Sequence, residues 1–270
     1  MPVYQSEQQQ IWRRRTPRAR LLGALGWLLG LALVVLCWQL ITAQTNWGFV
    51  RDAPTQARDL FGRMIPPRWE YAPSLVRPLW DTINIATLGT LFATLLALPL
   101  IFLAARNTTP HPALRALAVL LIVTSRSVHS LIWALFIVYL VGPGVFAGVV
   151  AISLRSVGFV AKLLYEAVEE TDAKQIEAIR ATGASGLQVL LYGVVPQVMP
   201  TFAGVAAFRW DINIREATFL GLVGAGGIGL QLNSAINSLQ WSRAGVIFVA
   251  IFLLVLFSEW VSARVRQAVT

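Results

Sequence analysis

Apolar runs of about twenty residues recur along the chain, and no other feature constrains its fold as strongly. A helix of this length crosses the hydrocarbon core of a bilayer. Only 13% of the 270 residues are charged, whereas soluble domains contain about a quarter. We therefore predict an all-α, polytopic membrane protein, because a soluble fold would expose large apolar patches. The six predicted transmembrane helices are residues 21–41, 82–105, 116–141, 145–164, 198–223 and 243–261.

Polar stretches between these spans suggest how the chain is divided. No convincing cleavage pattern follows the first apolar run, so we expect that run to remain as an anchor. The single cysteine, Cys37, excludes an intrachain disulfide and a cysteine-based metal site. The predicted segments are a basic tail (1–20), an N-terminal transmembrane helix (21–41), an external connector (42–81) and a core (82–265) that contains a polar loop (165–197).

Lysine and arginine are unequally distributed between the two sides that six spans create. Twelve lie on the side of the N terminus: Arg13, Arg14, Arg15, Arg18, Arg20, Arg106, Arg115, Lys162, Lys174, Arg180, Arg264 and Arg266. Six lie on the other side: Arg51, Arg58, Arg63, Arg68, Arg77 and Arg243. The positive-inside rule places both termini and the polar loop in the cytoplasm. The net charge of +9 is accordingly interpreted as basic cytoplasmic loops, and we expect no nucleic-acid partner.

Charged residues lie inside the predicted spans, where each costs at least about 2.5 kcal/mol on insertion. Because the four basic residues outnumber the two acidic ones, they favour the passage of an anion. Arginine presents a planar fork of donors that matches phosphate-like oxygens. The six residues that lie away from the ends of the spans are Arg126, Arg155, Arg209, Arg215, Asp211 and Glu216.

Helical periodicity sorts the polar residues of the fifth span onto two faces. At about 100° per residue, Arg209, Asn213 and Glu216 share one face, and Asp211 and Arg215 share the opposite face at a spacing of four. Two interpretations remain open: local ion pairs that hold helices together, or the lining of an anion path. A lone histidine inside a span is more often a packing residue than a ligand. The predicted path consists of Arg209, Asn213, Arg215, Asp211, Glu216, Arg126, His129 and Arg155.

The glycine run from Gly224 to Gly229 matches the spacing G-x-G-x-x-G. Apolar spans flank it on both sides, whereas a dinucleotide site needs a strand before the glycines and a βαβ unit. We therefore expect these glycines to permit a bend or close helix packing. The sequence contains no Walker lysine motif, HExxH motif or metal-ligand cluster, so we predict a protein that does not itself hydrolyse ATP and holds no cofactor or metal.

The polar loop carries a second, more specific motif. Glu177, Ala178, Ile179, Gly183 and Pro196 resemble the EAA loop of ATP-binding cassette (ABC) importer permeases. The family pattern is Glu-Ala-Ala, three residues, Gly, nine residues, an aliphatic residue, one residue, and Leu-Pro. Here Ile179 replaces the second alanine, Gly193 the aliphatic residue and Val195 the leucine. The resemblance implies a coupling helix that contacts an ATPase subunit, through Glu177, Ala178, Ile179, Ala181, Gly183, Ala184 and Pro196.

Three further stretches resemble phosphonate-uptake permeases: residues 191–200, 208–215 and 221–229. This resemblance implies a type I ABC importer permease fold, with a core of five transmembrane helices and an extra N-terminal helix. It also implies a homodimer in the bacterial inner membrane, two cytoplasmic subunits that bind ATP and Mg, and an external solute-binding protein. The expected function is therefore ATP-driven import of phosphonates or a related phosphorus oxyanion by alternating access.

Three alternatives stay open on the sequence. An importer for another solute, such as methionine or a metal, would share the EAA-like loop. An ATP-independent anion channel would explain the charged spans but leave that loop without a role. A membrane-embedded hydrolase would have to use His129 with Ser127 or Ser130, and the sequence offers no well-placed acidic partner.

Overall fold

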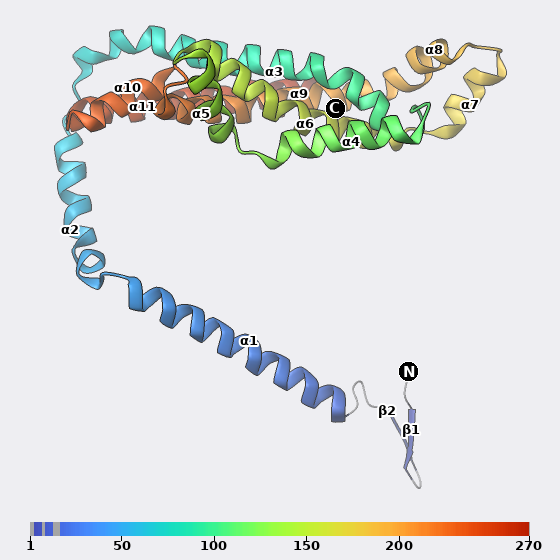
Figure 1. The fold of residues 1–270 in the computed structure, drawn as a ribbon, viewed down its shortest axis with the longest axis horizontal. Helices are drawn as coiled ribbons and strands as arrows, with labels where there is room; N and C mark the ends of the chain where they lie inside the picture. Colours follow the sequence, from blue (N-terminus) through green and yellow to red (C-terminus); the bar gives the residue numbers. More distant parts are fainter. Residues whose placement is uncertain (1–2, 7–8, 13–16, 270) are drawn as a thin grey trace. The chain divides into compact units, whose positions relative to one another are not determined.

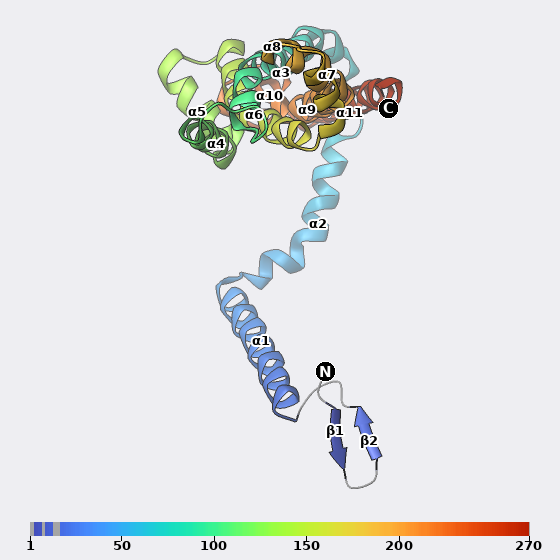
Figure 2. The same ribbon diagram turned by 90° about the vertical axis from the view of Figure 1, so that its right-hand side faces the viewer.

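The computed structural model describes residues 3–6, 9–12 and 17–269. The chain forms two compact units, Met1–Asp59 and Leu60–Thr270 (Figures 1 and 2). Three arginines that the sequence assigns to the basic tail, Arg13, Arg14 and Arg15, lie outside the described residues.

The first unit is built around one long apolar helix. Two short strands, β1 (Val3–Ser6) and β2 (Gln9–Trp12), pair antiparallel ahead of it. Helix α1 (Pro17–Gln44) follows and carries apolar side chains all around its circumference. Such a pattern is typical of a helix that spans a membrane. Helix α2 (Trp47–Met64) is amphipathic in sequence and continues into the second unit.

The second unit is a helical bundle. Its long helices are α3 (Val76–Ala104), α4 (Pro112–Ser127), α5 (Ser130–Val141), α6 (Val145–Glu169), α9 (Val195–Leu220) and α11 (Trp241–Val269). Its short elements are η1 (Trp69–Leu75), α7 (Ala173–Ala181), α8 (Gly186–Val189), the π-helical turn η2 (Leu190–Val194), η3 (Gly221–Val223) and α10 (Ile228–Asn237). The all-α fold predicted from the sequence is confirmed for this unit.

The number of membrane spans depends on how α4 and α5 are counted. Among the described residues, five helical segments are long and apolar enough to cross a bilayer, and α4 with α5 would make a sixth. These two helices meet at an angle of 90°. Val128 and His129 adopt extended backbone conformations between them, and the His129 side chain caps the start of α5. The predicted span 116–141 is therefore a bent pair of helices.

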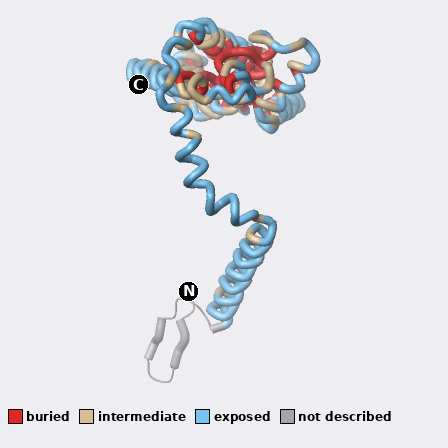
Figure 3. Tube along the Cα trace, turned by 90° about the vertical axis from the view of Figure 1, so that its left-hand side faces the viewer, coloured by how far each residue is buried: buried red, intermediate tan, exposed pale blue. Residues whose placement is uncertain are grey.

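Helix α6 forms the centre of the bundle, with α3, α4, α5 and α9 packed around it. Figure 3 shows that the buried residues concentrate in this part of the chain. Many buried residues of α6 are small, including Ala147, Gly148, Ala151 and Ser156. Small side chains let neighbouring helices approach closely, and this allows polar groups on different helices to meet.

The bundle has two distinct ends (Figure 1). Helices α7 and α8 lie at one end, and α10 lies at the other. The glycine run leads into α10, which begins at Ile228, and Gly224, Gly226 and Gly227 have positive φ angles. A Cβ atom on Gly229 would lie 2.1 Å from the Thr218 carbonyl oxygen. The prediction that these glycines permit a bend and close packing is confirmed.

Candidate functional site

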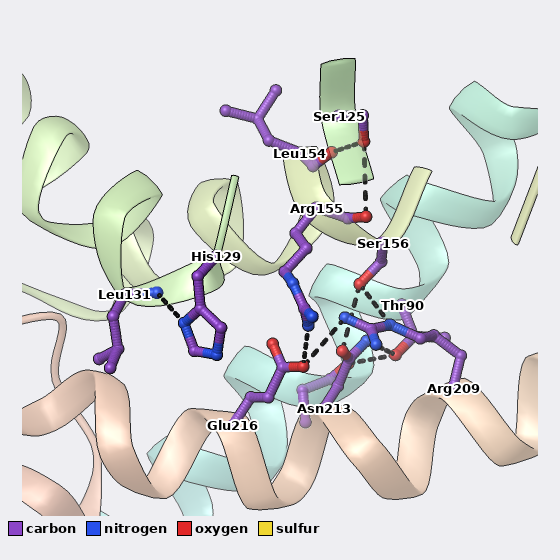
Figure 4. A network of polar contacts seen from close by, with 11 residues as sticks. Thr90, Ser125, His129, Leu131, Leu154, Arg155, Ser156, Arg209, Asn213 and Glu216 are labelled. Atoms are coloured by element: carbon purple, nitrogen blue, oxygen red, sulfur yellow. Dashed lines mark hydrogen bonds and ion pairs between the residues drawn. The ribbon is translucent and has the colours of Figure 1, made fainter. Parts of the chain in front are cut away.

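Arg209 lies at the centre of a polar network inside the bundle (Figure 4). It projects from α9 and is only 1% exposed. Its Nε donates a hydrogen bond to Ser156 Oγ on α6 at 2.9 Å, and its Nη2 lies 3.3 Å from Glu216 Oε1. Its Cζ atom also lies 5.0 Å from the centre of the Phe159 ring. The guanidinium is thus enclosed by an anion, a hydroxyl and an aromatic face.

A relay of hydrogen bonds continues from Ser156 to α3. The Ser156 hydroxyl donates to Asn213 Oδ1 at 3.1 Å, and Asn213 Nδ2 donates to Thr90 Oγ1 at 2.8 Å. Thr90 in turn donates to the carbonyl oxygen of Ala86 at 2.7 Å. Each donor of this chain of hydrogen bonds has an acceptor, so Ser156, Asn213 and Thr90 join α6, α9 and α3 through their side chains.

Glu216 connects two arginines. One of its oxygens, Oε1, accepts from Arg155 on α6 as well as from Arg209. Its other oxygen, Oε2, is buried and has no hydrogen-bond partner among the described residues, and the same is true of Arg155 Nε. A buried polar atom without a partner costs about 1–3 kcal/mol, so both atoms mark places where a further group could bind.

A second ion pair lies on the opposite face of α9. Asp211 pairs with Arg215 one turn later, as the spacing of four predicts. The other oxygen of Asp211 accepts from Ser258 on α11 at 2.7 Å. Asp211 is almost fully buried, whereas the Arg215 side chain is 46% exposed. Arg215 therefore remains accessible, unlike Arg209.

The two remaining residues of the predicted path lie near the bend between α4 and α5. Arg126 is exposed in the last turn of α4 and does not join the network. His129 lies at the start of α5, where its Nδ1 accepts from the Leu131 amide at 3.3 Å. Figure 4 shows the His129 ring and the Glu216 carboxylate on neighbouring elements. A cavity of about 260 Å³ between α5 and α9 is bordered by both residues and by Arg215.

The EAA-like residues lie on and around α7. Asp172 caps this helix by accepting from the Lys174 amide at 2.9 Å. Gly183, with a φ of 82°, follows the last turn, which is the usual position of a glycine that ends a helix. Three residues of the predicted contact surface are exposed on α7: Glu177, Ala178 and Ala181. Ala184 is half-buried in the turn before α8, and Pro196 lies in the first turn of α9.

Two departures from the EAA pattern meet in space. Ile179 packs inward, and a Cβ atom on Gly193 would lie 3.3 Å from its Cδ1 atom. The EAA pattern has alanine at position 179 and an aliphatic residue at position 193. This chain instead has the large residue at position 179 and the small residue, glycine, at position 193. The exchange preserves the packing of α7 against the π-helical turn η2.

Several residues of the site have no signal in the sequence. Gln197, on α9, accepts from the Asp172 amide at 2.9 Å and donates to the Gly193 carbonyl at 2.6 Å, so it joins α7 to α9. Thr90, Ser156 and Ser258 complete the polar network from other helices. Periodicity identifies residues on one helix, but these partners are brought together only by the packing of the bundle.

The comparisons with known proteins agree with this arrangement. A family described as "Binding-protein-dependent transport system inner membrane component" matches residues 72–269. The chain belongs to this family. It is a permease of the ABC importer type, and the matched region contains both the polar network and the EAA-like loop.

Two relatives illustrate the similarity of this permease to other transport permeases. The phosphite transport system permease protein PtxC of Stutzerimonas stutzeri is 39% identical over 92% of this chain and 89% of that protein. The phosphate-import permease protein PhnE of Mycolicibacterium smegmatis is 41% identical over 77% of this chain and 39% of that protein.

A solved structure supports the fold. The inward-facing MetNI methionine ABC transporter contains a chain that superimposes with a TM-score of 0.64 at 23% identity. The match covers 73% of this chain and 96% of the other. The type I ABC importer permease fold predicted from the sequence is thereby confirmed.

Proposed function

We propose that this permease imports phosphorus oxyanions such as phosphonates or phosphite. The observation that carries the proposal is the pair of ion-pair clusters within the helical bundle, in which Arg155, Arg209 and Arg215 outnumber Asp211 and Glu216. A surplus of positive charge in a low-dielectric interior favours an anion. The names of the two relatives, which refer to phosphite and phosphate, support the same class of solute.

Within this function we assign different roles to the predicted path residues. Arg209, Asn213 and Asp211 brace the helices, because their polar atoms are buried against other side chains. The accessible residues Arg215 and His129, with Glu216 beside them, border the cavity and would meet the solute. Arg155 positions Glu216, and Arg126 adds positive charge at the end of α4.

The proposed assembly contains more than this chain. A second copy of the permease would complete the pathway, and two separate cytoplasmic subunits would bind and hydrolyse ATP with Mg. The description of the family as binding-protein-dependent supports an external solute-binding protein. No cofactor is assigned to this chain and no nucleic acid is proposed as a partner.

ATP hydrolysis would reach the solute path through α7. Its exposed residues Glu177, Ala178 and Ala181 form the surface that we assign to the ATPase. Movement of α7 would be transmitted to α9 by Gln197 and by the contact between Ile179 and Gly193. A shift of α9 would expose the cavity to one side of the membrane and then to the other.

The proposed orientation places α7, α8, both termini and the tail (1–20) in the cytoplasm. The connector (42–81) and α10 would then lie outside, and the core (82–265) would span the inner membrane. The excess of lysine and arginine at the α7 end supports this orientation.

Stimulation of ATP hydrolysis tests the proposed solute. The reconstituted complex would be assayed with methylphosphonate, phosphite, phosphate and methionine. We expect a phosphorus oxyanion to raise hydrolysis most. No response to any phosphorus oxyanion, or a larger response to methionine, would contradict the proposal.

A further inference from the structure

The cavity at the bend between α4 and α5 has features of a binding site. It measures about 260 Å³ and is bordered by His129, Ser130, Arg215 and Glu216, with apolar side chains around them. Sites for drug-sized ligands start at about 300 Å³, so this volume suits a smaller solute. His129 is exposed, and the cavity is therefore open to entry.

Two residues that border the cavity on the α5 side, His129 and Ser130, carry hydrogen-bond donors. Ser130 is fully buried, and its Oγ has no hydrogen-bond partner in the part of the chain that the structure describes. It is the first residue of α5, a 12-residue helix whose N-terminal end carries partial positive charge. His129 Nδ1 accepts from the Leu131 amide, so the hydrogen of the neutral ring lies on Nε2, which is a second donor.

The facing wall, on α9, offers both charge signs. Arg215 contributes a half-exposed guanidinium. Glu216 contributes Oε2, a buried acceptor without a partner. The ion pairs to which Arg215 and Glu216 belong contain three arginines (Arg155, Arg209 and Arg215) and two carboxylates (Asp211 and Glu216), so the arginines exceed the carboxylates by one. The site therefore favours an anion. Glu216 Oε2, however, would repel an anion oxygen that carries no hydrogen.

We propose that this cavity binds a tetrahedral oxyanion that retains one acidic hydrogen. Ser130, His129 and Arg215 donate to its deprotonated oxygens, and its remaining O–H donates to Glu216 Oε2. Phosphonates, phosphite and phosphate largely or partly keep such a hydrogen near neutral pH, whereas sulfate has none. Sulfate would leave Glu216 without a donor and place a bare oxygen against a carboxylate. This inference rests on the proposed function and adds a selectivity site within the permease.

Binding to the permease itself can be measured without the solute-binding protein. The permease would be purified with its ATP-binding subunits, and the 31P resonance line width of phosphite would be recorded at neutral pH. We expect the wild-type complex to broaden the line, and methylphosphonate but not an equal concentration of sulfate to reverse the broadening. No broadening, or equal competition by sulfate, would overturn the site.

Three variants sharpen the test. Ser130→Ala removes one donor and should weaken phosphite binding about tenfold, or ~1.4 kcal/mol. Ser127→Ala is the matched control, because Ser127 is exposed and its hydroxyl donates to the Val123 carbonyl within α4. Glu216→Gln replaces the acceptor with a donor, so sulfate should now compete. Equal binding by Ser130→Ala and the control would overturn the site even if Glu216→Gln fails to fold.

The proposed function is tested separately in the same preparations. Uptake of phosphite by the complete complex, with its solute-binding protein, would be measured in vesicles. Uptake without any effect of Ser130→Ala on binding contradicts only the site. Absence of uptake for every phosphorus oxyanion contradicts the proposed function itself.

Discussion

Arg209 shows how a full charge is retained inside a membrane-embedded bundle. Its guanidinium contacts Glu216, Ser156 and the Phe159 ring, and it is almost completely buried. Removing one partner of a buried ion pair leaves the other charge uncompensated and costs about 3–5 kcal/mol. We infer that this residue contributes to stability rather than to contact with the solute.

Replacement of Arg209 tests that inference. Arg209→Ala should lower the thermal unfolding temperature of the purified complex, because Glu216 loses one of its two cations. Leu253→Ala is the control, since Leu253 is exposed on α11. If Arg209→Ala unfolds at the temperature of the control and only weakens solute binding, Arg209 contacts the solute and our assignment is wrong.

The sequence predicted part of this site and could not predict the rest. The helical period placed Arg209, Asn213 and Glu216 on one face, and the structure agrees. Their partners Ser156 and Thr90 lie 57 and 123 residues from Asn213 along the chain. Such contacts depend on how α3, α6 and α9 pack, and a single sequence carries no signal for that packing.

At the scale of elements, the contact between α7 and the π-helical turn η2 connects the EAA-like loop to the bundle. Ile179 occupies the space that a side chain at Gly193 would need. π-Helical turns are often found at functional positions in helices. The size of these two residues should therefore control how firmly α7 is attached.

A double-mutant cycle measures this attachment. Gly193→Leu should displace α7, at a cost of about 1–3 kcal/mol from overpacking, and should reduce solute-stimulated ATP hydrolysis. Adding Ile179→Ala makes room and should restore most of the stimulation. If the double variant is no better than Gly193→Leu alone, the two side chains do not compensate each other.

Gln197 provides a second connection between α7 and α9. Gln197→Leu keeps the approximate shape but leaves the Asp172 amide without its acceptor. We expect basal ATP hydrolysis to persist while its stimulation by solute falls about tenfold, since an unsatisfied polar group costs about 1–3 kcal/mol. Gln267→Leu, at an exposed position near the end of α11, serves as the control. Stimulation equal to that of the control would exclude Gln197 from coupling.

The positions of the helices could be predicted from the sequence better than the angles between them. The apolar runs correctly identified the long helices. The polar interruption at Ser127–Ser130 was visible, but the 90° angle between α4 and α5 was not, because an angle depends on what each helix packs against. The sequence did not predict helix α10, which lies between the predicted spans 198–223 and 243–261. The glycines at its start are typical of a connecting loop.

At the scale of the whole molecule, orientation in the membrane can be tested with cysteine labelling. Cys37→Ser removes the single native cysteine. Ser185→Cys, in the turn before α8, and Ser238→Cys, after α10, then report on opposite ends of the bundle. An impermeant thiol reagent should label position 238 in spheroplasts and position 185 only after permeabilisation. The reverse pattern would place the termini and the EAA-like loop outside.

Energy coupling is assigned to α7 and the solute path to α9, and only residues 182–194 separate these two helices in the chain. A permease without an ATPase can only equilibrate its solute, because accumulation requires a source of free energy that distinguishes two states. A channel with the same charged helices would behave in that way. Accumulation of the solute above its external concentration therefore distinguishes an ATP-driven importer from a channel.

The most direct measurement is uptake of phosphite into vesicles that contain the complete complex, with and without enclosed ATP. We predict that phosphite accumulates above its external concentration only with ATP, and that Glu177→Lys abolishes accumulation while the protein remains inserted. Equilibration without ATP that stops at the external concentration, or normal accumulation by Glu177→Lys, would contradict the account.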